Sequence, residues 1–331
     1  MLTITCAHND KPRHQVLNEA EEGTSIHWHG QYQQGSQWAD GVPGVTQCPI
    51  SPGSLFPFYQ FTANPAGTFW YHSHTEYQRD DGLSGVFVVR EKDEDVACDL
   101  TEHVIHLQEW FRSPARERYA GGNEEAPSVL LVNGQGRIDL EDTSQPWPVF
   151  KISPHCSQQR FRLVGALTSH CPVIVSVEGH MLTVVASDGQ EVEPELVSSL
   201  TISNGERFDF LISTEGKEAK SYQMTFAGAE GSWTECSGLA TLAFLQYEDA
   251  PVDQAAVPDY ASAISVPGLH LNPYPSLPLP EQQTGVAVVD LRSKQALEHP
   301  EPADTTFYFL LADEEAGASI NMVNIDNDCQ R

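Results

Sequence analysis

Short apolar runs separated by turn-forming residues are the feature that most constrains how this chain can fold. Runs rich in Val, Ile and Phe recur, such as "GVFVVR" (85–90), "CPVIVSVEG" (171–179) and "ERFDFLIST" (206–214). Long stretches with helical periodicity are scarce, and 24 Gly and 22 Pro among 331 residues supply the many turns that short strands need. The pattern predicts an all-β protein built from sandwich domains.

The same pattern predicts how the chain is divided. We expect a first domain over residues 1–95, closed by an acidic turn-like stretch, and a second domain over 96–250. Residues 251–302 are rich in Pro, Ala and Ser, which predicts an extended connector on the surface. Residues 303–331 begin with one strand-like run, so we expect the start of a truncated third domain. About one strand precedes residue 25, so the first domain is expected to be short at its N-terminus.

Charge and cysteine usage exclude several classes of function. The 46 acidic and 18 basic residues give a net charge of −28, which repels phosphate backbones, so we expect no nucleic-acid partner. No run approaches the roughly 18 apolar residues of a membrane span, and no signal peptide is visible. The seven cysteines are scattered without a CxxC motif, so neither a zinc ribbon nor a thioredoxin-like site is indicated.

Two His-x-His pairs stand inside strand-like sequence. "SIHWHG" contains His27 and His29, and "FWYHSHTE" contains His72 and His74. Residues two apart on a strand point to the same face, so two such strands side by side would present four imidazoles to one place. Imidazole is a good ligand for copper and zinc, and copper binds most tightly among the divalent first-row metals. Packing histidines are the alternative, but the repeated pair favours a metal site.

The residues around the pairs carry a resemblance to a known family. "HWHG" is followed by "QWADGVPGVTQCPISPG", and "HSH" is preceded by "NPAGTFWY". Together these strings resemble the first cupredoxin domain of a multicopper oxidase of the animal laccase-like kind. Further along, "LVNGQGR", "RFRLVGA" and "NGERFDFLI" resemble the second such domain. The resemblance covers residues 2 to about 248 and implies tandem cupredoxin-like Greek-key β-sandwich domains.

The resemblance also implies roles for individual residues. In the family, electrons enter at a type-1 copper and pass to a trinuclear cluster, where dioxygen is reduced to water. The match assigns His27 to the type-2 copper. It assigns His29, His72 and His74 to the type-3 pair. Asp40, in the "DGVP" turn, matches an acid that assists proton delivery, which dioxygen reduction requires. An Asp that only forms the turn is the alternative.

Two further expectations follow from the same resemblance. A disulfide between Cys48 and Cys171 would join the two domains, and two buried free thiols are the alternative. Trp28, Trp70 and Tyr71 flank the ligand positions, and we expect them to pack the strands rather than to carry electrons.

The type-1 copper ligands of the family have no match in these residues. Such a site needs two histidines, a cysteine thiolate and usually an axial methionine. The family supplies them from HxxHxH and HCHxxxH motifs in its third domain, and neither motif occurs in the 331 residues. Ser157 and Pro172 stand where the two His-Cys dipeptides would need a second histidine. We therefore expect type-2 and type-3 ligands without a type-1 site. The histidines not expected to bind copper include His103, His106, His180, His270 and His299.

Two hypotheses for function follow. The first is a laccase-like multicopper oxidase, or a fragment of one, that couples one-electron oxidation of phenols or Fe(II) to reduction of dioxygen, with half of the trinuclear site in this chain. The second is a non-catalytic copper-binding cupredoxin module. A weaker third hypothesis is a two-copper site assembled between subunits through His29, His72 and His74. The expected partners are dioxygen and a small reducing substrate, and the family implies an extracellular location.

Overall fold

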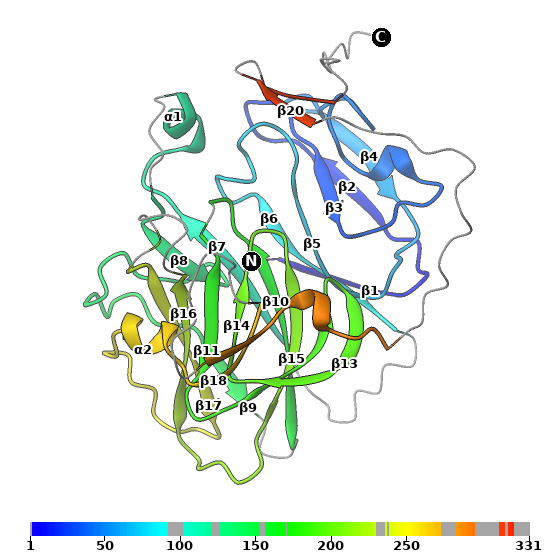
Figure 1. Ribbon diagram of the computed structural model, residues 1–331. Coiled ribbons are helices and arrows are strands. Elements are labelled where there is room, and N and C mark those ends of the chain that lie inside the picture. The colour runs from blue at the N-terminus through cyan, green and yellow to red at the C-terminus, as the bar shows by residue number, and fades with distance from the viewer. Residues whose placement is uncertain are drawn as a thin grey trace.

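The computed structural model describes residues 2–91, 102–120, 126–152, 156–169, 171–229, 236, 238–272, 283–294, 311–314 and 317–320. Strands dominate these residues, so the all-β prediction is confirmed (Figure 1). No helix among them is long and apolar enough to cross a membrane. The helical elements are short: η1 (Gln37–Ala39), α1 (Ala115–Ala120), α2 (Tyr260–Ile264) and η3 (Val288–Asp290).

The first sandwich packs a four-stranded sheet against a two-stranded ribbon. The sheet has the order β1-β6-β5-β3, and the ribbon pairs β2 with β4. Trp28, Tyr59, Phe61, Phe69 and Phe87 fill the space between them. Two strands precede β3, where about one was expected. The bounds are β1 (Thr3–Ala7), β2 (Arg13–Leu17), β3 (Ile26–His29), β4 (Leu55–Gln60), β5 (Gly67–Ser73) and β6 (Ser84–Arg90).

The second sandwich is larger and closes around its own core, in which Phe161, Phe208, Phe210 and Phe226 are buried. One sheet has the order β13-β12-β15-β10-β7-β8, and the other has the order β19-β18-β14-β11-β16-β17-β9. The first of these sheets comprises β7 (His103–Trp110), β8 (Val129–Val132), β10 (Gln158–Ala166), β12 (Leu182–Ser187), β13 (Gln190–Val197) and β15 (Arg207–Ser213). The second comprises β9 (Val149–Ile152), β11 (Val173–Val177), β14 (Ser199–Ile202), β16 (Ser221–Gly228), β17 (Ala240–Tyr247), β18 (Gly268–Leu271) and β19 (Gln283–Val286).

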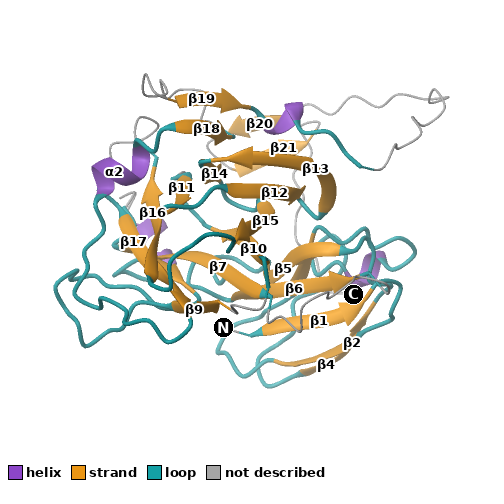
Figure 2. Ribbon diagram, turned by 90° about the horizontal axis from the view of Figure 1, so that it is seen from below, coloured by secondary structure: helices purple, strands orange, loops and turns teal. Residues whose placement is uncertain are grey.

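The two sandwiches lie directly against each other, as Figure 2 shows for β5 and β6 beside β7 and β10. Trp70, Val86 and Val88 of the first sheet pack with Val164 and Ala166 of β10. These first-sheet residues share one face because side chains alternate along a strand. The face of β5 that carries Trp70 is therefore turned toward the second sandwich.

A buried polar cluster ties the same interface. Thr68 on β5 donates its hydroxyl hydrogen to Oδ1 of Asp209 on β15 at 2.6 Å. Asp209 also accepts from the guanidinium of Arg162 at 3.0 Å, and both of those side chains are only 1% exposed. Because a buried charge is costly unless it is paired, this cluster fixes how the two sheets meet.

The expected connector at 251–302 is in part a component of the second sandwich. Within its described residues, β18 pairs in parallel with β14, and β19 pairs with β18. Leu271 is fully buried in the core. This stretch therefore extends a sheet instead of only running over the surface.

Only a small part of the expected third-domain start is described. There β20 (Leu311–Glu314) and β21 (Gly317–Ile320) form an antiparallel hairpin. The remainder of 303–331 lies outside the described residues.

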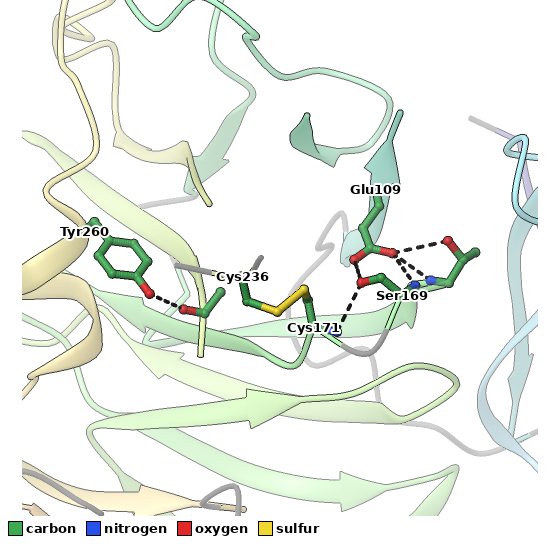
Figure 3. Close-up of a disulfide and its surroundings, with 7 residues drawn as sticks. Glu109, Ser169, Cys171, Cys236 and Tyr260 are labelled. Carbon is green, nitrogen blue, oxygen red and sulfur yellow. Dashed lines mark hydrogen bonds between the residues drawn. A yellow bond between two sulfur atoms is a disulfide. The ribbon is translucent and has the colours of Figure 1, made fainter. Parts of the chain in front are cut away.

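The predicted disulfide between Cys48 and Cys171 is wrong. Cys171 is bonded to Cys236, 65 residues further along, within the second sandwich (Figure 3). The loop that leads into Cys171 is anchored by the buried carboxylate of Glu109, which accepts hydrogen bonds from the backbone N–H groups of Thr168 and Ser169 at 2.8 Å each. This disulfide therefore cross-links residues within one domain rather than joining two domains.

Candidate metal centre

Pairing of β3 with β5 brings the two His-x-His pairs together. The strands are antiparallel, and His27 lies directly opposite His72 while His29 lies opposite Trp70. Directly opposite residues in an antiparallel pair present their side chains to the same face. The predicted convergence of His27, His29 and His72 therefore follows from the register of one strand pair.

Three of the four imidazoles form a tight group. One ligand-capable nitrogen from each of His27, His29 and His72 lies within 4.8 Å of the other two. His74 follows the end of β5, and its ring centroid is 5.5 Å from that of His27 and 5.9 Å from that of His72. The structure thus places all four predicted ligands around one spot, with His74 at the exposed rim.

Backbone carbonyls fix the orientation of two rings. Nδ1 of His27 lies 2.7 Å from the carbonyl oxygen of Asp40, and Nδ1 of His72 lies 2.8 Å from that of Ser73. A carbonyl oxygen can only accept, so each Nδ1 carries the hydrogen and each Nε2 keeps its lone pair. Metal-binding histidines are typically held in this way, through the ring nitrogen that does not bind the metal.

Asp40 contacts His27 through its side chain as well as its carbonyl. Its Oδ1 lies 3.3 Å from Nδ1 of His27, and the Asp40 side chain is 29% exposed. Gly41 makes this approach possible, because it has φ +79° and a Cβ there would lie 1.8 Å from the carbonyl oxygen of Ile26. Only glycine tolerates both the left-handed backbone and the close contact. The "DG" of the turn is therefore what brings Asp40 to the first ligand.

The environment favours the neutral form of three of these imidazoles, those of His29, His72 and His74. Burial, followed by the positive charge of Arg207, lowers the pKa of His29 to about 3. Burial likewise lowers the pKa of His72 to about 3, although its hydrogen bond to Ser73 opposes the change. The pKa of His74 is also lowered, mainly by burial. Metal ligation requires the neutral ring, so the unprotonated form is already the stable one at neutral pH.

The aromatic neighbours pack as expected. Trp70 is fully buried, and its ring centroid lies 4.3 Å from that of His72 and 5.0 Å from that of His29. Trp28 points to the opposite face of β3 and packs with Phe61 in the first core. The indole of Trp70 therefore forms the wall against which two candidate ligands rest.

Sequence reasoning missed Arg207, which the second sandwich contributes. Its Nε donates to the carbonyl of Thr68 at 3.2 Å, and Nη2 donates to the carbonyl of Asp188 at 3.0 Å. The side chain is 7% exposed and lies close enough to lower the pKa of His29. No motif marks this arginine, because its position depends on how the two sandwiches dock.

Four of the histidines not expected to bind copper lie on the second sandwich. His103 and His106 face opposite sides of β7, as their spacing predicted: the ring of His103 stacks on Phe161 in the core, and Nε2 of His106 lies 3.2 Å from Oγ of Ser84 in the first sheet. His299 lies outside the described residues. The hydrogen-bond partners of the other two rings are the carbonyl of Glu178 and the hydroxyl of Tyr247 for His180, and the hydroxyls of Ser199 and Thr201 for His270.

Comparison with protein families finds matches to two consecutive parts of the chain. Two family models described as "Multicopper oxidase" match residues 1–94 and 101–250. A laccase of Trametes maxima is 34% identical over 263 residues, which cover 78% of this chain and 51% of that protein. An L-ascorbate oxidase of Brassica rapa subsp. pekinensis is 33% identical over 260 residues, covering 71% and 45%. The chain thus spans about half the length of the curated relatives it matches.

Solved structures agree on the fold. The laccase from Botrytis aclada is 29% identical, with a TM-score of 0.65, and the match covers 78% of this chain and 49% of that one. Fet3p, described as a multicopper oxidase that functions in iron import, matches with a TM-score of 0.70 over 96% of this chain and 56% of its own. Because Fet3p is only 22% identical to this chain, its similarity supports the fold and nothing further.

Proposed function

Because this chain belongs to the multicopper oxidase family, we propose that it holds half of a trinuclear copper site in a laccase-like oxidase. Such an oxidase couples one-electron oxidation of a phenol or Fe(II) to the reduction of dioxygen to water, and we place it outside the cell. The observation that carries the proposal is the group of three imidazoles, whose ligand atoms lie within 4.8 Å of one another.

The donor set fits copper. The family binds copper, and the three closest groups here, His27, His29 and His72, are all imidazoles. Catalytic zinc sites more often combine histidine with a carboxylate, and imidazole binds copper more tightly than zinc. The rings of His27 and His72 each keep Nε2 unprotonated, because Nδ1 donates to a carbonyl. Copper, when bound, would supply the electron-transfer chemistry.

We assign the individual ligands as the family match implies. His27 serves the type-2 copper, and its ring lies 5.8 Å or less, centroid to centroid, from each of the other three. His29, His72 and His74 serve the type-3 pair.

Asp40 is proposed to move protons between solvent and the site. Its carboxylate contacts the ring of His27 and remains partly exposed, so it reaches both the site and solvent. Its carbonyl orients the same ring. One residue would then combine a positioning role, through the backbone, with a proton-transfer role, through the side chain.

A non-catalytic copper-binding module is the second candidate function. It rests on the same histidine group, which can hold copper whether or not electrons reach it from a type-1 site. Among the described residues, the metal-capable group of His, Cys, Asp and Glu is the histidine trio already named. Under this reading the chain holds copper without turnover.

Copper loading of the purified 331-residue chain tests the proposal. We expect bound copper, without the intense blue absorption that a Cys-thiolate type-1 site produces and with negligible phenol oxidation. A chain that takes up no copper refutes the proposed site. For the oxidase reading, joining an HCH-bearing third domain from a family member should restore the blue colour and phenol oxidation. If that fusion is blue but inactive, the non-catalytic module is the better description.

A further inference from the structure

The side-chain amide of Gln78 joins the segment that leads into β3 to the segment that ends β5. Its Oε1 accepts hydrogen bonds from the hydroxyls of Thr24 and Ser73, each at 2.7 Å. Its Nε2 donates to the carbonyl of Gly23 at 2.8 Å. Ser73 is the last residue of β5, and Thr24 lies two residues before β3 begins. A single amide therefore connects these two segments.

Gln78, Thr24 and Ser73 together are called the clamp here. Each of the two hydroxyl residues lies close in sequence to a candidate ligand. Ser73 immediately follows His72, and its carbonyl accepts the Nδ1–H of that ring at 2.8 Å. Thr24 lies three residues before His27. Since Gln78 holds the hydroxyl of Ser73, it also fixes the peptide that orients His72.

Gln78 is itself held in place by its backbone. The backbone N–H of Gln78 donates to the carbonyl of Thr75 at 3.2 Å, and its carbonyl accepts from the N–H of Leu83 at 3.0 Å. Thr24 is 5% exposed and Ser73 is 1% exposed. Removing the amide would leave their hydroxyls buried without this acceptor, which is costly.

A second bridge between the same segments lies on the outside. Arg116 of α1 contacts Glu22 at 2.7 Å and Glu76 at 2.6 Å. Its side chain is 58% exposed, and exposed ion pairs contribute little. Of these two bridges, the inner amide of Gln78 is therefore the stronger, and Oγ of Ser25 lies 3.1 Å from Oγ1 of Thr75 between the same segments.

We infer that Gln78 is a positioning residue of the copper site: by holding Thr24 and Ser73 together, it fixes the segments that flank the β3–β5 pair and the tilt of the His72 ring. This inference rests on the proposed function and adds to it a residue that contributes no metal ligand. Groups that orient metal ligands commonly alter affinity by 10- to 100-fold when they are changed.

The test compares three variants of the full chain in Cu(II) titrations and electron paramagnetic resonance spectra. Gln78→Met keeps the length of the side chain and removes its hydrogen bonds. Gln78→Glu keeps an acceptor for both hydroxyls and loses the donor to Gly23. Gln246→Met is the matched control, because that amide donates to the carbonyl of Ala250 at 2.7 Å in the second sandwich. Thermal unfolding of each metal-free variant reports its stability.

We expect Gln78→Met to weaken Cu(II) binding by about 10-fold or more and to change the copper hyperfine pattern. Gln78→Glu should recover part of both, and the Gln246→Met control should match wild type. The inference is overturned if Gln78→Met binds as wild type does with the same spectrum, or if the control loses as much. If Gln78→Met does not fold, Ser73→Ala takes its place, because it removes the hydroxyl that Gln78 holds beside His72. An unchanged copper spectrum in Ser73→Ala then overturns the inference, and a changed one supports it. Wild type without copper uptake refutes the proposed function and this inference together.

Discussion

Protonation of His270 should detach part of the second sandwich at acidic pH. His270 lies on β18, is 2% exposed, and has both ring nitrogens in hydrogen bonds, to Ser199 at 2.6 Å and to Thr201 at 2.8 Å. Burial lowers the pKa of His270 to about 4. The hydrogen bonds attach β18 to β14, where the chain had been expected to be only a surface connector.

The direction in which stability changes with pH follows from proton uptake. The unfolded chain binds a proton on this histidine near its ordinary pKa of about 6.5, whereas the folded chain does so only near 4. Between these values the unfolded state holds more protons, so stability is lost as pH falls below about 6.5. At pH 5 the pKa difference that has taken effect is about 1.5 units, which corresponds to about 2 kcal/mol in the free energy of unfolding.

His270→Gln isolates this contribution, because the amide can bond the same hydroxyls and does not titrate. Urea unfolding of the wild type and the variant at pH 7.5 and pH 5 gives four free energies. We expect the wild type to lose about 2 kcal/mol more than the variant between the two pH values, since contributions of the other histidines cancel in the difference. Equal losses in the two proteins would show that His270 is not a buried neutral ring, and the attachment of β18 would then need another explanation.

Three further outcomes test the site and the interface. His27→Ala should reduce copper retention after dialysis, whereas His180→Ala should not; equal retention contradicts the ligand assignment. Gly41→Ala should lower copper affinity, because its Cβ would lie 1.8 Å from a strand carbonyl oxygen. Circular dichroism should show that the variant stays folded, and wild-type copper affinity would show that the turn tolerates the displacement. Asp209→Asn should lower the free energy of unfolding by about 3 kcal/mol, because it removes a charge paired with buried Arg162; a loss below about 1 kcal/mol in urea would contradict the role of this cluster.

The sequence predicted the parts of this molecule that depend on local periodicity. The spacing of His27 and His29 sends both side chains to one face of β3, and the same argument holds for His72 and Trp70 on β5. Short apolar runs between turn-forming residues also predicted the strand-rich fold. That the two pairs belong to neighbouring strands came from the family resemblance, because spacing within one strand says nothing about its partner.

The errors arose where composition or analogy stood in for long-range contact. Proline-rich sequence correctly indicates little helix, but it does not reveal that β18 finds an open edge at β14, about seventy residues earlier. The pairing of Cys171 was taken from relatives, whereas its actual partner, Cys236, belongs to the same domain and precedes another strand of the same sheet. Both features depend on contacts between residues that are far apart in the sequence. Cysteine spacing alone does not determine which cysteines pair.

The site shows the same division between what a motif fixes and what tertiary structure fixes. A His-x-His pair determines which rings share a face, but the orientation of the ring of His27 depends on a carbonyl at Asp40, thirteen residues away. The orientation of His72 depends on Ser73, which Gln78 holds from the following turn. Metal geometry is sensitive to such partners, which belong to loops and carry no periodic signal. The candidate ligands could therefore be named from the sequence. Asp40 was named there only for proton delivery, and its orienting carbonyl, like Gln78, became visible once the chain was folded.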